Sequence, residues 1–136
     1  LFHRDTAMTP EVKKELISLA IKSRQVAYAP YSNFLVGAAL LTSDGSIYTG
    51  CNVENTSYGL CICAERTAIC KAVSEGHQEF QAIAVAANPF ATPWGACRQF
   101  IVEFGKQIEI IAVDANNPEH VKTWVIEDLI PENFKF

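Results

Sequence analysis

The chain has 136 residues, of which 49% are hydrophobic and 19% charged, and its formal net charge at pH 7 is −4. These values are typical of one globular domain over residues 1–136, and the acidic balance argues against a nucleic-acid partner, which usually requires a basic surface. No apolar run approaches the length of a membrane span and the N-terminal stretch shows no signal-peptide core, so we expect neither a membrane partner nor secretion.

The first predicted elements are a helix and a hairpin. The helix begins at Thr9-Pro10-Glu11, where a capping hydroxyl precedes a proline and an acid, and its apolar periodicity runs to about Tyr28. The near-continuous apolar run 34–41 predicts a buried strand, and residues 47–53 return from the turn at 43–46 as its partner.

Helices and strands alternate through the rest of the chain. In order, we expect a helix at 64–76, a strand at 81–87, a short helix at 98–105, a strand at 107–113, an edge strand at 120–124 and a final helix at 125–131. The complete order α-β-β-α-β-α-β-β-α predicts an α/β fold with three layers, α-β-α, around a five-stranded mixed sheet.

The cysteines are Cys51, Cys61, Cys63, Cys70 and Cys97. Their odd number argues against a disulfide framework and favours a reducing, cytoplasmic setting, and any one alone is best explained as a small buried hydrophobe. Cys63 and Cys97 differ, because each precedes a predicted helix. Helix N-termini favour thiolates, and parallel βα units bring their helix starts to one edge of a sheet, so these two thiols could converge as half of a zinc site.

Glu65 lies two residues after Cys63, in the first turn of the same predicted helix. By position alone it complements the helix dipole, but both side chains could also reach a ligand beyond the helix end. A redox pair would require Cys-x-x-Cys, and Cys61-Ile62-Cys63 is one residue too short. No glycine-rich phosphate loop is present, so phosphate chemistry is less favoured still.

Two segments carry a family resemblance: GCNVENTSYGLCICAERTAICKAV (50–73) and PWGACRQFIVEFG (93–105). They resemble the small zinc-dependent cytidine deaminases, whose wider signature is His or Cys, any residue, Glu, and later Pro-Cys-x-x-Cys. The resemblance extends from about Tyr28 to the final phenylalanines. It implies hydrolytic deamination of cytidine or deoxycytidine to uridine or deoxyuridine and ammonia, as in pyrimidine salvage, by a cytoplasmic homotetramer that holds zinc.

The resemblance also implies residue roles. Cys63 and Cys97 would be zinc thiolates, and Glu65 would shuttle protons from the zinc-bound water to the pyrimidine ring and the leaving amine as zinc hydroxide attacks. The other implied roles are ribose binding for Asn52 and Glu54, base contact for Phe34, contact with a neighbouring subunit's site for Phe134, thiolate hydrogen bonding for Arg66, and support for Tyr58 and Gln99.

Position alone offers simpler explanations for several of these residues. Asn52 and Glu54 are equally typical of a turn at the end of a strand, and Arg66 of a protein surface. Phe34 lies in the apolar run 34–41 and is better explained as core.

Trp94 departs from the family pattern, because it stands where the signature requires a further ligand cysteine. An indole N–H is only a donor and offers a metal no lone pair. Three hypotheses stay open: a working deaminase with another ligand or a tolerated change, a catalytically impaired nucleoside-binding or assembly protein, and an ordinary enzyme into which Trp94 was introduced. The presence of Asn52, Glu54, Glu65 and Arg66 favours an enzyme.

Overall fold

The computed structural model describes residues 8–134, so both ends of the predicted domain 1–136 lie outside the described residues. The elements are α1 (Pro10–Ser23), β1 (Gly37–Thr42), β2 (Ile47–Cys51), α2 (Ala64–Ser74), β3 (Phe80–Ala87), α3 (Gly95–Val102), β4 (Glu109–Asp114), β5 (Asn117–Val125) and α4 (Ile126–Leu129), with short 3-10 turns at Arg24–Val26 and Tyr58–Leu60. Their order confirms the prediction. Within residues 8–134, no helix is both long and apolar enough to cross a membrane.

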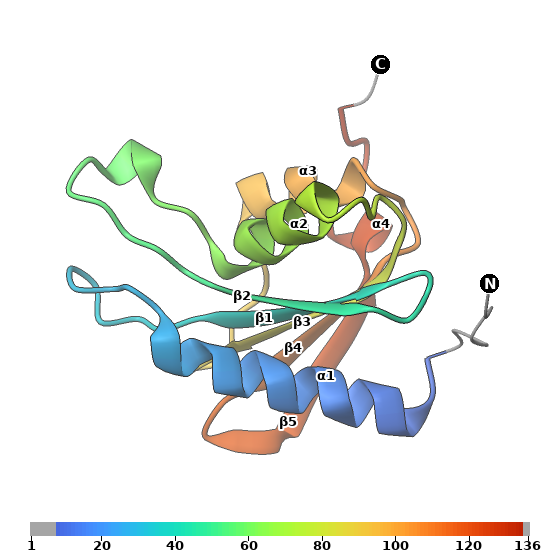
Figure 1. Cartoon of the computed structure of the whole chain (residues 1–136), viewed down its shortest axis with the longest axis horizontal. Helices are drawn as coiled ribbons and strands as arrows, with labels where there is room; N and C mark the ends of the chain where they lie inside the picture. The colour runs from blue at the N-terminus through green and yellow to red at the C-terminus, as the bar shows by residue number, and fades with distance from the viewer. Residues whose placement is uncertain (1–7, 135–136) are drawn as a thin grey trace.

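The five strands form one mixed sheet in the order β2-β1-β3-β4-β5. Strand β1 is antiparallel to β2 and β3, β3 is parallel to β4, and β5 closes the edge antiparallel to β4. Strands β2, β3 and β4 therefore run in one direction. Helix α1 covers one face of the sheet, and α2, α3 and α4 cover the other, which gives the predicted three layers (Figure 1).

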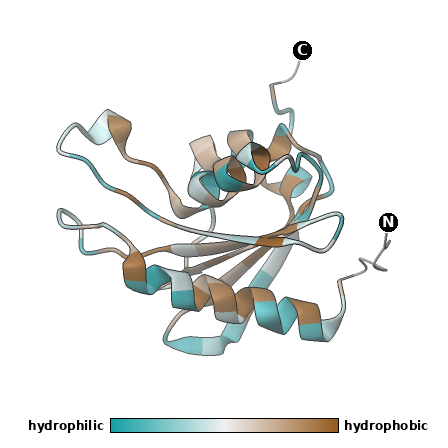
Figure 2. Ribbon diagram, in the orientation of Figure 1, coloured by the Kyte–Doolittle hydropathy of each residue, from teal (hydrophilic) through white to brown (hydrophobic). Residues whose placement is uncertain are grey.

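The alternating side chains of the central strands fill both interfaces between helix and sheet. Ala38 and Leu40 of β1 pack on the face covered by α2 and α3, whereas Ala39 and Leu41 pack toward α1. Successive side chains of β1 thus point to opposite faces of the sheet, although the run is apolar at every position. This pattern is typical of a strand that is buried on both faces. The edge strand β5 is mainly hydrophilic and exposed (Figure 2).

Two predicted boundaries are wrong near the start of the sheet. Helix α1 ends at Ser23 rather than near Tyr28. The Tyr28 N–H donates to the distant Asn52 carbonyl at 3.0 Å instead of to a carbonyl of the helix. The strand begins at Gly37 rather than at Phe34. The Asn52 side chain engages the Phe34 carbonyl and the Val36 N–H, which holds this segment in a loop.

Gly50 allows α2 to lie directly on β2. A Cβ atom at this position would be 2.5 Å from the Ala64 carbonyl oxygen and 2.6 Å from the Ala68 nitrogen, both of them backbone atoms of α2. Backbone atoms cannot rotate away, so the approach of this helix to the sheet depends on the missing side chain.

We therefore expect Gly50→Ala to lower the free energy of unfolding by at least the 1–3 kcal/mol that is typical of overpacking. Urea denaturation would measure the change. Gly59→Ala is the matched control, because nothing lies within 4 Å of a Cβ at Gly59. Equal stability of the two variants would show that α2 can shift without cost.

Candidate active site

The starts of α2 and α3 meet at one edge of the sheet, beyond the carboxyl ends of β2 and β3. Cys63 is the N-cap of α2, as expected, and its sulfur accepts the Arg66 N–H at 3.4 Å. Cys97 lies inside the first turn of α3, as its third residue, and not before the helix as predicted. The Cys63 and Cys97 sulfurs and a Glu65 carboxylate oxygen all lie within 4.8 Å of one another. The expected convergence of the two thiols is therefore present.

Burial and proximity shift the ionisation of all three groups. Glu65 is only 4% exposed. Its burial, and secondly the charge on Cys63, raises the pKa of the Glu65 carboxyl to about 7. The pKa of the Cys63 thiol is lowered to about 6. The hydrogen bond from Cys97 is the largest cause, and the contacts with Arg66 add to it. The same hydrogen bond and burial raise the pKa of Cys97 above its ordinary value. In the metal-free site Cys63 carries the charge and Cys97 keeps the proton.

Arg66 supplies the positive charge of the site. Its Nε donates to the Cys63 sulfur at 3.2 Å and its Nη2 to the Cys61 carbonyl at 3.1 Å. The hydrogen bond to Cys63 also raises the pKa of the guanidinium. A partly buried arginine that contacts a thiolate in this way balances its charge, which is the contact that the family resemblance implies.

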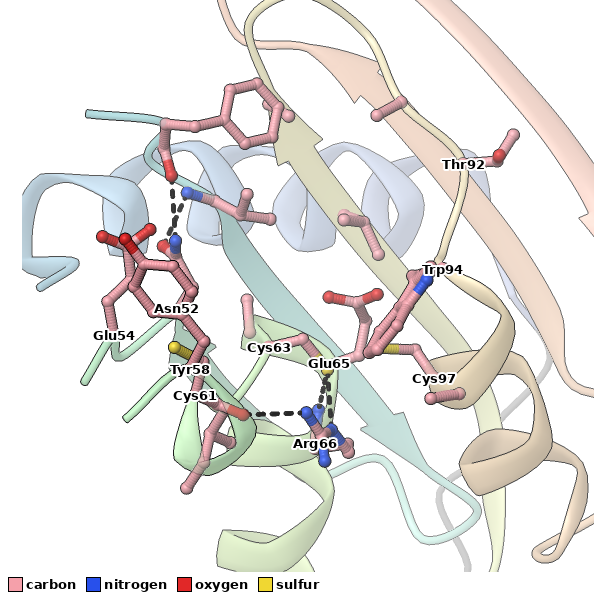
Figure 3. Close-up of a pocket in the computed structure, with 18 of the residues that line it drawn as sticks. Asn52, Glu54, Tyr58, Cys61, Cys63, Glu65, Arg66, Thr92, Trp94 and Cys97 are labelled. Carbon is pink, nitrogen blue, oxygen red and sulfur yellow. Dashed lines mark hydrogen bonds between the residues drawn. The ribbon is translucent and has the colours of Figure 1, made fainter. Parts of the chain in front are cut away.

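A cavity of about 480 Å³ opens over the three groups. The lining residues from the sequence prediction are Phe34, Asn52, Glu54, Tyr58, Cys63, Glu65, Arg66, Trp94 and Cys97 (Figure 3). This volume lies within the range of small-molecule sites, about 300–1,000 Å³. Phe34 is 36% exposed, so its interpretation as a core residue is wrong.

Asn52 and Glu54 hold the loop that carries Phe34 on the wall opposite the helix starts. The Asn52 amide donates to the Phe34 carbonyl at 2.8 Å and accepts the Val36 N–H at 2.9 Å. The Glu54 carboxylate accepts hydrogen bonds from the Tyr31 and Ser32 N–H groups and from the Ser32 hydroxyl, which lower its pKa. Each polar side chain keeps unused hydrogen-bonding capacity that can face the cavity.

Gln99 and Phe134 lie outside this lining. The Gln99 Nε2 donates to the Phe134 carbonyl at 3.0 Å, which ties the C-terminal segment to α3. Phe134 itself is 69% exposed. Within this chain, therefore, neither residue joins the other predicted site residues.

Arg98 is a positioning residue that the sequence analysis did not identify. Its guanidinium donates to the Pro93 carbonyl at 2.6 Å, to the Leu129 carbonyl at 2.9 Å and to the Thr92 hydroxyl at 3.0 Å. These bonds fix the loop between β3 and α3, which carries Trp94 and leads into the turn of α3 that holds Cys97. Only its place directly after Cys97 could have drawn attention to it, because bonds to distant carbonyls leave no periodic pattern in a sequence.

The donor set fits a zinc ion, since two cysteine sulfurs and a carboxylate oxygen are all ordinary zinc ligands. Trp94 adds no ligand, as expected from its indole; it is the N-cap of α3 and is 70% exposed. Cys61 also lines the cavity, but its sulfur accepts the Asn55 N–H at 3.3 Å and lies outside the three-residue cluster.

Two thiols and a buried carboxyl that converge in this way match the signature of the zinc-dependent deaminases, apart from Trp94. Residues 10–113 match the cytidine and deoxycytidylate deaminase zinc-binding region. The chain therefore belongs to this deaminase family.

Relatives and solved structures agree with this assignment. The chain is 57% identical over 109 residues to a probable cytidine deaminase of Dictyostelium discoideum, covering 78% of this chain and 74% of the relative. It is 55% identical over 93 residues to a cytidine deaminase of Sporosarcina psychrophila, covering 67% and 68%. The crystal structure of cytidine deaminase from Burkholderia pseudomallei superposes with a TM-score of 0.84 at 46% identity, covering 93% of this chain and all of that one.

The hydrogen bond between Cys63 and Cys97 gives a testable ionisation. In metal-free protein the Cys63 thiolate should be present above pH about 6, because its pKa is lowered. Cys97→Ala and Arg66→Gln should each move this midpoint upward, because the hydrogen bond from Cys97 and the contacts of Arg66 both lower the pKa of Cys63. Alkylation rates of the Cys63 peptide against pH, followed by mass spectrometry, measure the midpoint.

Lys71→Gln is the control for this titration. It also removes a positive charge from α2, but the Lys71 side chain donates to the Thr49 carbonyl and not to Cys63. Its midpoint should equal that of the unmodified protein. An unchanged midpoint in Cys97→Ala would contradict the assignment of the shared proton.

Proposed function

We propose that this protein hydrolyses the exocyclic amine of cytidine or deoxycytidine, giving uridine or deoxyuridine and ammonia, as a step of pyrimidine salvage. The observation that carries the proposal is a buried carboxyl beside two converging thiols at the floor of a nucleoside-sized cavity. The relatives named above are described as a probable cytidine deaminase and a cytidine deaminase and match 78% and 67% of this chain, and the Burkholderia cytidine deaminase structure shares its fold.

Glu65 is suited to move protons in this reaction. Burial is the first cause that raises the pKa of its carboxyl, and it brings this group toward the neutral range in which general acid–base catalysis is effective. Zinc, when bound by Cys63 and Cys97, would lower the pKa of a coordinated water toward neutrality. Glu65 would take a proton from the attacking water and deliver it to the pyrimidine ring nitrogen, and would then carry the second proton, from the new hydroxyl on the ring carbon, to the departing amine.

The opposite wall of the cavity would hold the nucleoside. The carboxylate of Glu54 has about four acceptor sites and uses three of them on Tyr31 and Ser32, so one is left for a ribose hydroxyl. The Asn52 amide likewise keeps one N–H and one lone pair. Phe34, on the loop that these two residues hold, would contact the edge of the base.

Turnover of cytidine tests the proposal directly. Zinc-loaded protein should convert cytidine to uridine, followed by ultraviolet absorbance and confirmed by chromatography. Glu65→Gln should lower kcat by about 10²–10⁴-fold, the usual contribution of a general acid–base group, with little change in KM. Glu75→Gln, an exposed position just beyond the far end of α2, is the control and should keep full activity.

Cytidine binding without turnover by the unmodified protein would overturn this proposal. It would favour the alternative of a deaminase-fold protein retained as a nucleoside-binding or assembly protein.

We also propose that the protein is a cytoplasmic homotetramer in which Phe134 reaches a neighbouring site. Exposed apolar side chains gather on the two loops that extend past the sheet near the cavity (Figure 1). They are Tyr28, Tyr31, Val53, Tyr58, Leu60 and Ile62. Such surfaces are typical of protein interfaces. All five cysteines are free thiols, which suits a reducing compartment.

Light scattering coupled to gel filtration tests the assembly. The mass should be four times the 15.0 kDa of one chain. Leu60→Glu, which places a charge among these apolar residues, should shift the protein to smaller species, and Phe134→Ala should lower kcat/KM. A monomeric mass for the unmodified protein at micromolar concentration would refute the tetramer.

A further inference from the structure

The side chain of Trp94 is an aromatic surface that opens into the cavity. Trp94 lines the cavity together with Glu65 and Phe34, and it is 70% exposed. The cysteine that the deaminase signature has at this position offers no comparable surface. Tryptophan rings are enriched at binding surfaces, because covering such a ring removes a large apolar area from water. The location of this ring at the cavity points to a bound molecule as its cover.

The cavity keeps room for a substrate although tryptophan is much larger than cysteine. Its volume is about 480 Å³ with the indole in place. The ring therefore forms part of the wall and does not block the cavity. Trp94 is the N-cap of α3 but makes no side-chain hydrogen bond in that role. The indole is thus not engaged in capping the helix, and its face is available to a ligand.

The segment that carries Trp94 is held on both sides. Before it, the Phe90 ring stacks on His120 at a centroid distance of 4.9 Å and lies 6.3 Å from the ring of Trp124, both on the edge strand β5. After it, the Arg98 N–H donates to the Trp94 carbonyl at 2.9 Å, and the Arg98 guanidinium donates to the preceding carbonyl at 2.6 Å. A backbone fixed in this way restricts where the indole can lie, which reduces the entropy lost when a ligand binds.

The proposed chemistry brings the pyrimidine ring to this indole. Glu65 has to reach the ring nitrogen and the exocyclic amine, so these atoms must come within about 2.6–3.2 Å of its carboxylate, directly or through one water. Figure 3 shows the Trp94 indole beside the Glu65 carboxylate. A pyrimidine ring that Glu65 can protonate therefore also lies next to the indole. Stacking of a base on an aromatic side chain stabilises binding without requiring any hydrogen bond to the base.

We propose that Trp94 is a substrate-contacting residue whose indole packs against the pyrimidine ring of the bound nucleoside. The inference deepens the proposed function and rests on it for the identity of the ligand. The base then lies between Trp94 and Phe34, which line the cavity from opposite walls. The residue that adds no metal ligand thus adds an aromatic contact to the substrate.

Fluorescence isolates Trp94, because the chain has two tryptophans and Trp124 lies outside the cavity lining. Uridine is the probe, since the product of the proposed reaction binds without turnover, and excitation is set where uridine does not absorb. In Trp124→Phe the emission comes from Trp94, and uridine should quench it in a saturable manner. In Trp94→Phe the emission comes from Trp124, and uridine should leave it unchanged. If Trp124→Phe does not fold by circular dichroism, quenching in the unmodified protein and its loss in Trp94→Phe decide.

Calorimetric titration of zinc-loaded protein with uridine measures what the ring contributes. Trp94→Leu should weaken binding by about 5–150-fold, the range for removal of one stack between a base and an aromatic side chain. Trp94→Phe keeps an aromatic face and should weaken binding by less than about fivefold. Trp124→Phe is the matched control and should bind uridine as the unmodified protein does. None of these changes adds or removes a metal ligand, so the zinc content of all four proteins should agree.

Equal affinity of Trp94→Leu and the unmodified protein for uridine, or unquenched Trp94 emission at saturating uridine, would overturn the inference. Turnover of cytidine in that case would leave the proposed function standing. Quenching of Trp94 and weaker binding by Trp94→Leu, in a protein that does not turn cytidine over, would support the inference and refute the proposed function. Absence of uridine binding would overturn the inference. Trp94 emission that changes with protein concentration and not with uridine would also overturn it, because a second copy of the chain would then cover the ring.

Discussion

The contact between the α2 backbone and strand β2 determines where the chemistry of this protein is located. Gly50 brings the start of α2 against the sheet, and β2 and β3 run in the same direction on either side of β1. The helices that follow these two strands therefore begin at the same edge. Residues far apart in the sequence, Cys63 and Cys97, are brought together by strand direction and one close backbone approach, and not by any local contact.

This convergence concentrates negative charge. Two thiols and a carboxyl within 4.8 Å cannot all ionise without a compensating cation, since like charges at this distance raise one another's pKa. In the metal-free site the protein responds by leaving a proton on Cys97, by raising the pKa of Glu65 and by placing Arg66 against Cys63. A divalent ion bound by these groups would relieve the same repulsion directly.

The sequence predicted the order of elements and the meeting of the two thiols, because apolar periodicity and helix-capping positions are local patterns. It did not predict the strand order β2-β1-β3-β4-β5, nor the loop at Phe34, which looks like strand in its apolar pattern. That loop is held by Asn52 and Glu54, and hydrogen bonds from side chains to distant backbone groups have no sequence period. For the same reason Arg98 was missed. The single-domain organisation over 1–136 stays a prediction.

The contacts of Arg98 explain how the chain accommodates tryptophan at position 94 without losing the site. A tryptophan contributes no side-chain hydrogen bond at the N-cap of α3, where Ser, Thr, Asp or Asn would normally stabilise the helix start. Arg98 instead ties the loop backbone at Pro93 to the end of α4 at Leu129. The position of Cys97 is therefore supported by contacts that do not use the Trp94 side chain. Trp94 itself adds no metal ligand and the contacts that hold this frame do not use its side chain, so we expect its consequences in metal affinity before folding.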